Sequence, residues 1–124
     1  MAKHVLVVDD HPAVALALRI AFKRDRRFEL AGSAATAAEG LERLDGQDVV
    51  LLDLHLPDLS GRELVRAFRE RAPAMPLVLH SAADDTPEVE AVRPLVDAVV
   101  PKNRVEDLLE VLARLTDAGS MIDK

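Results

Sequence analysis

The fold is decided by one stretch of the chain, Val49-Val50-Leu51-Leu52-Asp53-Leu54-His55-Leu56-Pro57-Asp58-Leu59-Ser60-Gly61. Its four leading apolar residues predict a strand that is buried on both faces of a parallel sheet. The run is too short to span a membrane. A single carboxylate, Asp53, ends the run before the chain turns through a loop. Because open parallel sheets bind ligands at the carboxyl ends of their strands, Asp53 is a candidate functional residue.

The composition predicts a single folded domain over residues 1–124, with a core at about 3–116 and a frayed tail at 118–124. The formal net charge of −6 argues against direct binding to nucleic acid. The chain has no cysteine, which excludes disulfides and thiolate metal sites. Because the amino terminus has no signal-peptide pattern, we expect a cytoplasmic protein without a membrane partner.

Apolar runs that predict strands alternate with helical patterns five times. The expected strands are residues 5–8, 28–32, 48–53, 76–80 and 98–100. The expected helix starts are the capping boxes Thr36 with Glu39, Ser60 with Glu63 and Asn103 with Glu106, together with Thr86-Pro87. This alternation predicts an α/β fold, a doubly wound five-stranded parallel sheet with helices on both faces.

Polar side chains lie at or just beyond four of the expected strand ends. They are Asp9, Asp10, Asp53, Ser81 and Lys102. The doubly wound topology brings such strand ends to one edge, so these side chains should converge on one crevice. Three neighbouring carboxylates repel each other, which raises at least one pKa unless a cation intervenes. An oxygen-only ligand set favours a hard divalent ion such as Mg²⁺.

Together these motifs resemble the receiver domain of response regulators. The resemblance rests on Val5-Leu6-Val7-Val8-Asp9-Asp10-His11-Pro12, on the stretch 51–61, on the serine that ends the fourth strand and on the lysine after the fifth. It extends from about residue 3 to 115 and implies a flavodoxin-like, chemotaxis-regulator-like sheet of order 2-1-3-4-5. The opening motif resembles receivers that precede LuxR-type helix-turn-helix domains. The sequence therefore predicts either a stand-alone receiver or one cut from a longer regulator.

The resemblance implies that Asp53 accepts a phosphoryl group from a histidine kinase or phosphotransfer protein. It implies that Asp10 and Asp53 ligate Mg²⁺, with Mn²⁺ as an alternative, and that Asp9 acts largely through a metal-bound water. The backbone carbonyl of His55 would be a further ligand. The chain would then be a signalling domain, with no enzymatic activity beyond its own phosphoryl uptake and autodephosphorylation.

The resemblance also implies a switch. Lys102 would pair with the phosphoryl oxygens, Ser81 would move to hydrogen-bond them, and the positions of His55 and Ala83 would tune dephosphorylation. The output partner or domain would contact the face made by the fourth helix, fifth strand and fifth helix, and a homodimer is a further option. Receivers usually have an aromatic residue where this chain has Val99. We therefore expect activation through repacking of residues 86–100.

Several residues have simpler interpretations. His11 is expected to be a loop residue that could perturb the charge of the site, and Asp58 to shape its own loop. The side chains of His55 and His80 are interpreted as structural, not as metal ligands. The arginines of the third helix are interpreted as a solvated face: Arg62, Arg66, Arg69 and Arg71.

Three other functions remain as alternatives. A degenerate receiver would act by protein contact without phosphorylation. An aspartyl-phosphate phosphatase of the haloacid-dehalogenase type would need a second aspartate where this chain has His55, and a cap domain. A flavin-binding module would need a hydroxyl- and glycine-rich loop after the first strand, where this chain has the acidic pair Asp9-Asp10.

Overall fold

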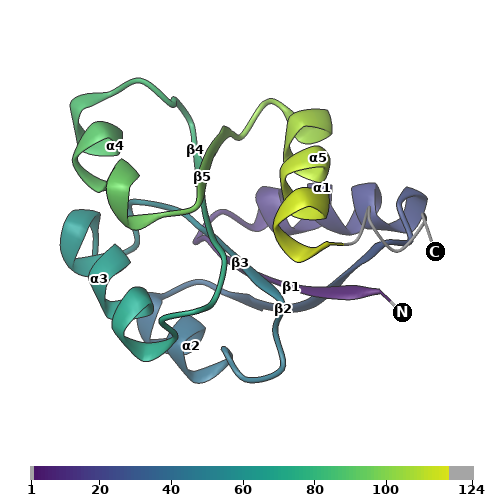
Figure 1. Cartoon of the computed structure of the whole chain (residues 1–124), viewed down its shortest axis with the longest axis horizontal. Coiled ribbons are helices and arrows are strands. Elements are labelled where there is room, and N and C mark those ends of the chain that lie inside the picture. The colour runs from purple at the N-terminus through teal and green to yellow at the C-terminus, as the bar shows by residue number, and fades with distance from the viewer. Residues whose placement is uncertain (1, 118–124) are drawn as a thin grey trace.

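The computed structural model describes residues 2–117, which form a five-stranded sheet flanked by helices (Figure 1). The strands are β1 (Lys3–Val8), β2 (Phe28–Ala34), β3 (Val49–Leu52), β4 (Leu77–Ser81) and β5 (Ala98–Pro101). The helices are α1 (Pro12–Arg24), α2 (Ala37–Glu42), α3 (Gly61–Arg71), α4 (Pro87–Val92), the 3₁₀ helix η1 (Arg93–Leu95) and α5 (Val105–Thr116). The strand order is β2-β1-β3-β4-β5 with every pairing parallel, which confirms the predicted fold.

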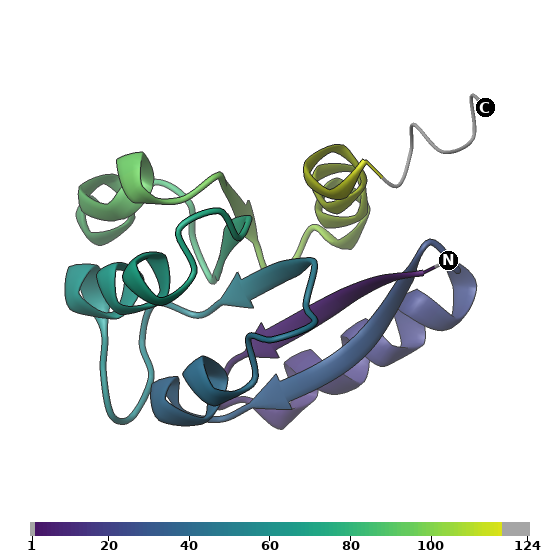
Figure 2. The same ribbon diagram turned by 60° about the horizontal axis from the view of Figure 1, so that its bottom comes forward.

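The core consists of two apolar layers, one on each face of the sheet. The views in Figure 1 and Figure 2 place α1 and α5 on one side of the sheet and α2, α3 and α4 on the other. Leu18 and Leu108 belong to the first layer, and Leu64 and Phe68 to the second. All four residues of β3 are fully buried, as its uninterrupted apolar run predicts.

The predicted helix starts are confirmed in part. Thr36 Oγ1 accepts a hydrogen bond from the Glu39 N–H at 3.1 Å, and Thr86 caps α4 in the same way. Ser60 is the N-cap residue of α3, as predicted, but the predicted side-chain cap of α3 and the predicted cap residue of α5 were wrong. The hydroxyl of Ser60 makes no cap bond to α3, and the residue that precedes α5 is Arg104 instead of Asn103. The carboxylates in the first turns of both helices still complement the helix dipoles.

Two side chains that we expected to act locally join separate elements instead. The Asp58 carboxylate accepts hydrogen bonds from the N–H groups of Ala37, at 2.9 Å, and Ala38, at 3.1 Å, at the start of α2. Arg69 donates from Nη2 to the Leu95 carbonyl at 2.9 Å and so ties η1 to α3. The interpretation of Arg69 as a solvated surface residue was therefore wrong.

Candidate functional site

Strand register brings the acidic residues to one edge of the sheet. Val8 pairs with Leu52 at the ends of β1 and β3, so Asp9 and Asp53 follow at the same level. The Asp53 N–H donates to the Val8 carbonyl at 2.9 Å, which holds the two chain segments together beyond the strands. The predicted convergence of Asp9, Asp10 and Asp53 is confirmed, because ligand atoms of all three lie within 4.8 Å of one another.

The lysine after β5 reaches the same cluster. Lys102 Nζ lies 2.8 Å from Asp9 Oδ2 and 3.7 Å from Asp53 Oδ2. The Lys102 N–H donates to the Ser81 carbonyl at 2.7 Å, which fixes the chain direction as the lysine leaves the sheet. An ammonium between two buried carboxylates offsets part of their mutual repulsion.

His11, which we expected to be a loop residue that could perturb the charge of the site, lies within this cluster. Its backbone N–H donates to Asp9 Oδ1 at 2.9 Å, and its Nδ1 lies 2.8 Å from the same oxygen. The same Nδ1 lies 3.3 Å from Asp10 Oδ1 and 3.8 Å from Asp53 Oδ2. The sequence signal was the position of His11 directly before Pro12, because a residue at the start of a helix after a strand faces the edge of the sheet.

Burial and neighbouring charges shift the pKa values of Asp53 and Asp9 in opposite directions. Burial raises the pKa of Asp53, the negative charge of Asp9 raises it further, and Lys102, the His55 N–H and His11 only partly counter this. Burial also acts to raise the pKa of Asp9, but the hydrogen bonds from Lys102 and His11 outweigh it and the net shift is downward. The side chain of Asp9 is only 2% exposed and that of Asp53 only 7%.

Two oxygens of the cluster, Asp9 Oδ2 and Asp53 Oδ2, are buried without a hydrogen bond of good geometry within the described residues, and Lys102 Nζ lies 2.8 Å from the first. Asp53 Oδ2 is buried without a hydrogen bond within residues 2–117, and its nearest cationic atoms, Lys102 Nζ and His11 Nδ1, lie at 3.7 and 3.8 Å. A buried carboxylate oxygen without a partner is costly unless a cation or donor completes its surroundings. The carboxylate set and this open oxygen fit a hard divalent cation.

The loop after Asp53 is closed on itself. The Gly61 N–H donates to the Leu54 carbonyl at 3.0 Å, and Gly61 has a φ of 63°, a left-handed conformation that favours glycine. His55 begins this loop, and its backbone N–H donates weakly to Asp53 Oδ1 at 3.5 Å. Its imidazole turns away from the carboxylates, with Nε2 3.2 Å from Glu88 Oε2 of α4.

The remaining predicted residues lie in or just after β4 and in β5. Ser81 is half-buried, and its hydroxyl accepts a hydrogen bond from the Ala83 N–H at 3.4 Å. Val99 pairs with Leu79 in the sheet and packs against the layer under α2, α3 and α4. His80 is 4% exposed, and burial followed by the charge of Lys102 lowers its pKa to about 4.

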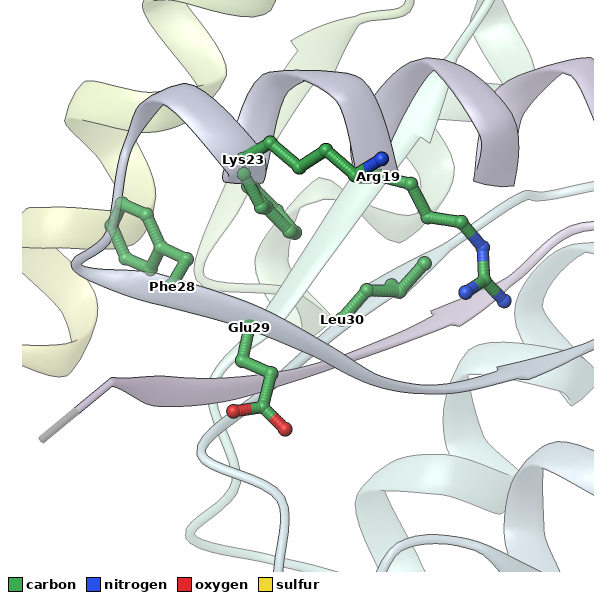
Figure 3. Close-up of a pocket in the computed structure, with 6 residues that line it drawn as sticks. Arg19, Lys23, Phe28, Glu29 and Leu30 are labelled. Carbon is green, nitrogen blue, oxygen red and sulfur yellow. The ribbon is translucent and has the colours of Figure 1, made fainter.

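Two hollows lie along α1. One opens beside the acidic cluster and is lined by Asp9, Asp10, His11, Pro12, Ala15, Leu16, Arg19, Ser33, Ala34 and Ala35. The other lies between α1 and β2, where Arg19 and Lys23 extend from the helix and Glu29 points away from it (Figure 3). Of these two hollows, the first is lined by residues of the acidic cluster.

Comparison with known proteins identifies the type of domain. The family model of the response regulator receiver domain matches residues 5–113. The transcriptional regulatory protein KdpE of Mycobacterium tuberculosis is 35% identical over 114 residues, which cover 92% of this chain and 50% of KdpE. The transcriptional regulatory protein MctR of Rhizobium johnstonii is 37% identical over 82 residues, 64% of this chain and 38% of MctR. The chain thus spans half or less of these curated relatives.

Solved structures show the same fold. The non-phosphorylated receiver domain of RcsB from Escherichia coli matches with a TM-score of 0.86 at 21% identity, over 94% of this chain and 95% of that one. The non-phosphorylated HemR receiver domain from Leptospira biflexa matches with a TM-score of 0.73 at 27% identity, over 92% and 94% of the two chains.

Proposed function

We propose that this chain, which belongs to the response-regulator receiver domain family, accepts a phosphoryl group on the carboxylate of Asp53. The observation that carries the proposal is Asp53 Oδ2, which is buried without a hydrogen bond within the described residues and lies 3.7 Å from Lys102 Nζ. Receiver domains partner with histidine kinases and output domains. We infer that a histidine kinase or phosphotransfer protein supplies the phosphoryl group to this chain.

The residues of the cluster fit a divalent cation, which we infer to be Mg²⁺, with Mn²⁺ as the alternative. Asp10 and Asp53 would hold it directly, Asp9 largely through a water, and the backbone carbonyl of His55 would complete the protein ligands. The bound ion would neutralise charge on the phosphoryl oxygens during transfer. The negative charge of Asp9 raises the pKa of Asp53. A bound cation would relieve this repulsion, which supports the assignment.

The transfer itself forms one bond and breaks one. A carboxylate oxygen of Asp53 attacks the phosphorus of a phosphohistidine, and the P–N bond breaks with its electron pair left on the donor imidazole, which takes a proton from solvent. Lys102 Nζ, now 2.8 Å from Asp9 Oδ2, shifts toward the new phosphoryl oxygens. The Ser81 hydroxyl leaves the Ala83 N–H and donates to the same group, which carries about −1.5 to −2 charge.

We infer that the output signal travels through residues 86–100. Val99 replaces the aromatic residue expected of a receiver, so a rotamer change of that ring is not available. Polar contacts connect the neighbourhood of Asp53 to α4 instead: His55 Nε2 lies 3.2 Å from Glu88 Oε2, and Arg62 donates to the Ala91 carbonyl at 3.3 Å. Repacking of α4, η1 and β5 would change the α4–β5–α5 face that an output domain, a partner protein or a second copy contacts.

Beryllofluoride binding tests the switch. With Mg²⁺ and beryllofluoride, which mimics an aspartyl phosphate, we expect the amide NMR shifts of residues 86–100 to change in the unaltered chain. Binding at the acidic cluster with no shift in that segment would overturn the proposed route. Glu88→Gln serves as the matched variant, because it keeps the shape of the side chain and weakens its pairing with His55.

Phosphoryl uptake tests the function. The chain is incubated with phosphoramidate or acetyl phosphate and Mg²⁺, and its intact mass is measured. We expect a gain of one phosphoryl group that is lost in Asp53→Asn and retained in Asp58→Asn, a matched change of an aspartate in the same loop that caps α2. No gain with any donor would support the alternative, a receiver that acts by protein contact alone.

The other inferences follow from the same site. We infer that the chain is a signalling domain instead of an enzyme, because His55 stands where an aspartyl-phosphate phosphatase needs a second aspartate. None of the helices within residues 2–117 is long and apolar enough to cross a membrane. A cytoplasmic location would suit phosphoryl transfer from a kinase.

A further inference from the structure

The side chain of His11 is 64% exposed, and its imidazole directs Nδ1 toward the carboxylates. Its Nδ1 lies 2.8 Å from Asp9 Oδ1, 3.3 Å from Asp10 Oδ1 and 3.8 Å from Asp53 Oδ2. The backbone N–H of His11 donates to Asp9 Oδ1 at 2.9 Å, and this bond holds the residue against the cluster. One nitrogen therefore approaches a different oxygen on each of the three carboxylates.

The separations of His11 Nδ1 from Asp10 Oδ1 and from Asp53 Oδ2 are those of ligands on a single ion. Two neighbouring ligands with bonds of roughly 2.0–2.2 Å to an octahedral ion lie about 3 Å apart, and opposite ligands lie about 4 Å apart. The distances from His11 Nδ1 to Asp10 Oδ1 and to Asp53 Oδ2 fall between these limits, whereas the 2.8 Å to Asp9 Oδ1 is a hydrogen-bond distance. Independently, Asp53 Oδ2 is buried without a hydrogen bond and points into the same space, which marks a position that a cation would complete.

We propose that His11 ligates the divalent ion through Nδ1, beside the carboxylates of Asp10 and Asp53, and so determines which metal the site prefers. An imidazole ligand adds little for Mg²⁺, which prefers oxygen, and more for Mn²⁺, Co²⁺ and Zn²⁺, which accept nitrogen. This site thereby favours transition-metal ions more strongly than a site with only oxygen ligands would. This inference rests on the proposed function, since both use the same cluster.

The other described histidines do not have this geometry. His55 directs its Nε2 to Glu88. His4 lies near the start of β1, at the opposite end of that strand from Asp9, and its Nδ1 lies 3.1 Å from the Gly46 carbonyl. His80 is a buried residue of β4 and is not among the clustered ligands. A histidine contribution to metal binding at this edge is therefore specific to His11.

Calorimetric titration with Co²⁺ and with Mg²⁺ tests the proposal on the full chain near neutral pH. The variants are His11→Asn, which retains a good helix-capping residue, and His11→Ala, which removes every side-chain ligand. We expect both to weaken Co²⁺ binding by about tenfold or more and Mg²⁺ binding by less than about twofold. The absorption spectrum of bound Co²⁺ should change in the same variants, because it reports the nitrogen ligand directly.

His4→Asn is the matched control for adventitious binding of Co²⁺ to histidine. Equal loss of Co²⁺ affinity in His4→Asn and His11→Asn, or equal loss of Co²⁺ and Mg²⁺ affinity in the His11 variants, would overturn the proposal. Tighter Mg²⁺ binding with unchanged Co²⁺ binding in those variants would overturn it as well, because His11 would then compete with the metal. Phosphoryl uptake by the unaltered chain with Mg²⁺ is measured separately. Failure of the proposed function would therefore be seen independently of the Co²⁺ and Mg²⁺ affinities of the variants.

Discussion

His80 makes the stability of the domain depend on pH in a way that a single substitution isolates. The side chain lies in β4 and is 4% exposed, and its Nδ1 has no hydrogen-bond partner within residues 2–117. Burial and the nearby charge of Lys102 lower its pKa from the ordinary 6.5 to about 4. Protonation of His80 is therefore less favourable in the folded domain than in the unfolded chain.

The direction and size of the effect follow from these two pKa values. Above about pH 6.5 both states are neutral at this position, so His80 contributes no pH dependence. As the pH falls below 6.5 the unfolded state gains a proton first, and stability is lost until about pH 4, where the folded state is protonated too. The loss amounts to about 2 kcal/mol between about pH 7.5 and about pH 5, and approaches about 3 kcal/mol below pH 4.

The assay compares urea unfolding of the unaltered chain with that of His80→Leu at several pH values. The other titrating groups are common to both chains, so the difference in unfolding free energy isolates His80. Replacement of an unpaired buried nitrogen by carbon adds an offset that is nearly independent of pH. We expect the unaltered chain to lose about 2 kcal/mol relative to His80→Leu between about pH 7.5 and about pH 5. A difference that stays constant with pH would refute the reasoning.

Three further substitutions test contacts that position the site. Gly40→Ala should destabilise the domain by about 1–3 kcal/mol in urea unfolding, because its new Cβ would lie 2.8 Å from the Val8 side chain; stability equal to that of the unaltered chain would contradict this close approach. Arg69→Met should cost about 1–3 kcal/mol and speed amide hydrogen exchange in η1, since the Leu95 carbonyl loses its donor; unchanged exchange there would show that the arginine is dispensable. Asp58→Ala should raise amide exchange at the start of α2 and lower the thermal midpoint, and protection equal to that of the unaltered chain would rule out the cap.

The sheet and the carboxylate cluster could be predicted because topology alone determines them. Uninterrupted apolar runs predict the strands, and parallel strands place Asp9, Asp53 and Lys102 at one edge whatever the details of the loops. Their proximity in the structure, with Lys102 Nζ 2.8 Å from Asp9 Oδ2, therefore agrees with the strand-end argument. The strand order needed more than local patterns, and came from the resemblance to a known family.

Contacts between distant segments could not be predicted in this way. Asp58 caps a helix that begins 21 residues earlier, and Arg69 donates to a carbonyl 26 residues later. Hydrophobic periodicity says which face of an element is buried but not which polar side chain reaches a neighbouring element. His11 was underestimated for a related reason, because the direction of its ring depends on the backbone turn that joins β1 to α1.

Chemical trapping of the phosphorylated residue tests the central claim most directly. After incubation with phosphoramidate and Mg²⁺, borohydride reduces an aspartyl phosphate to homoserine, which peptide mass spectrometry then locates. The account predicts homoserine at the position of Asp53 and at no other aspartate of the acidic cluster. Homoserine at Asp9 or Asp10, or a phosphoryl group that borohydride leaves on a histidine, would contradict it.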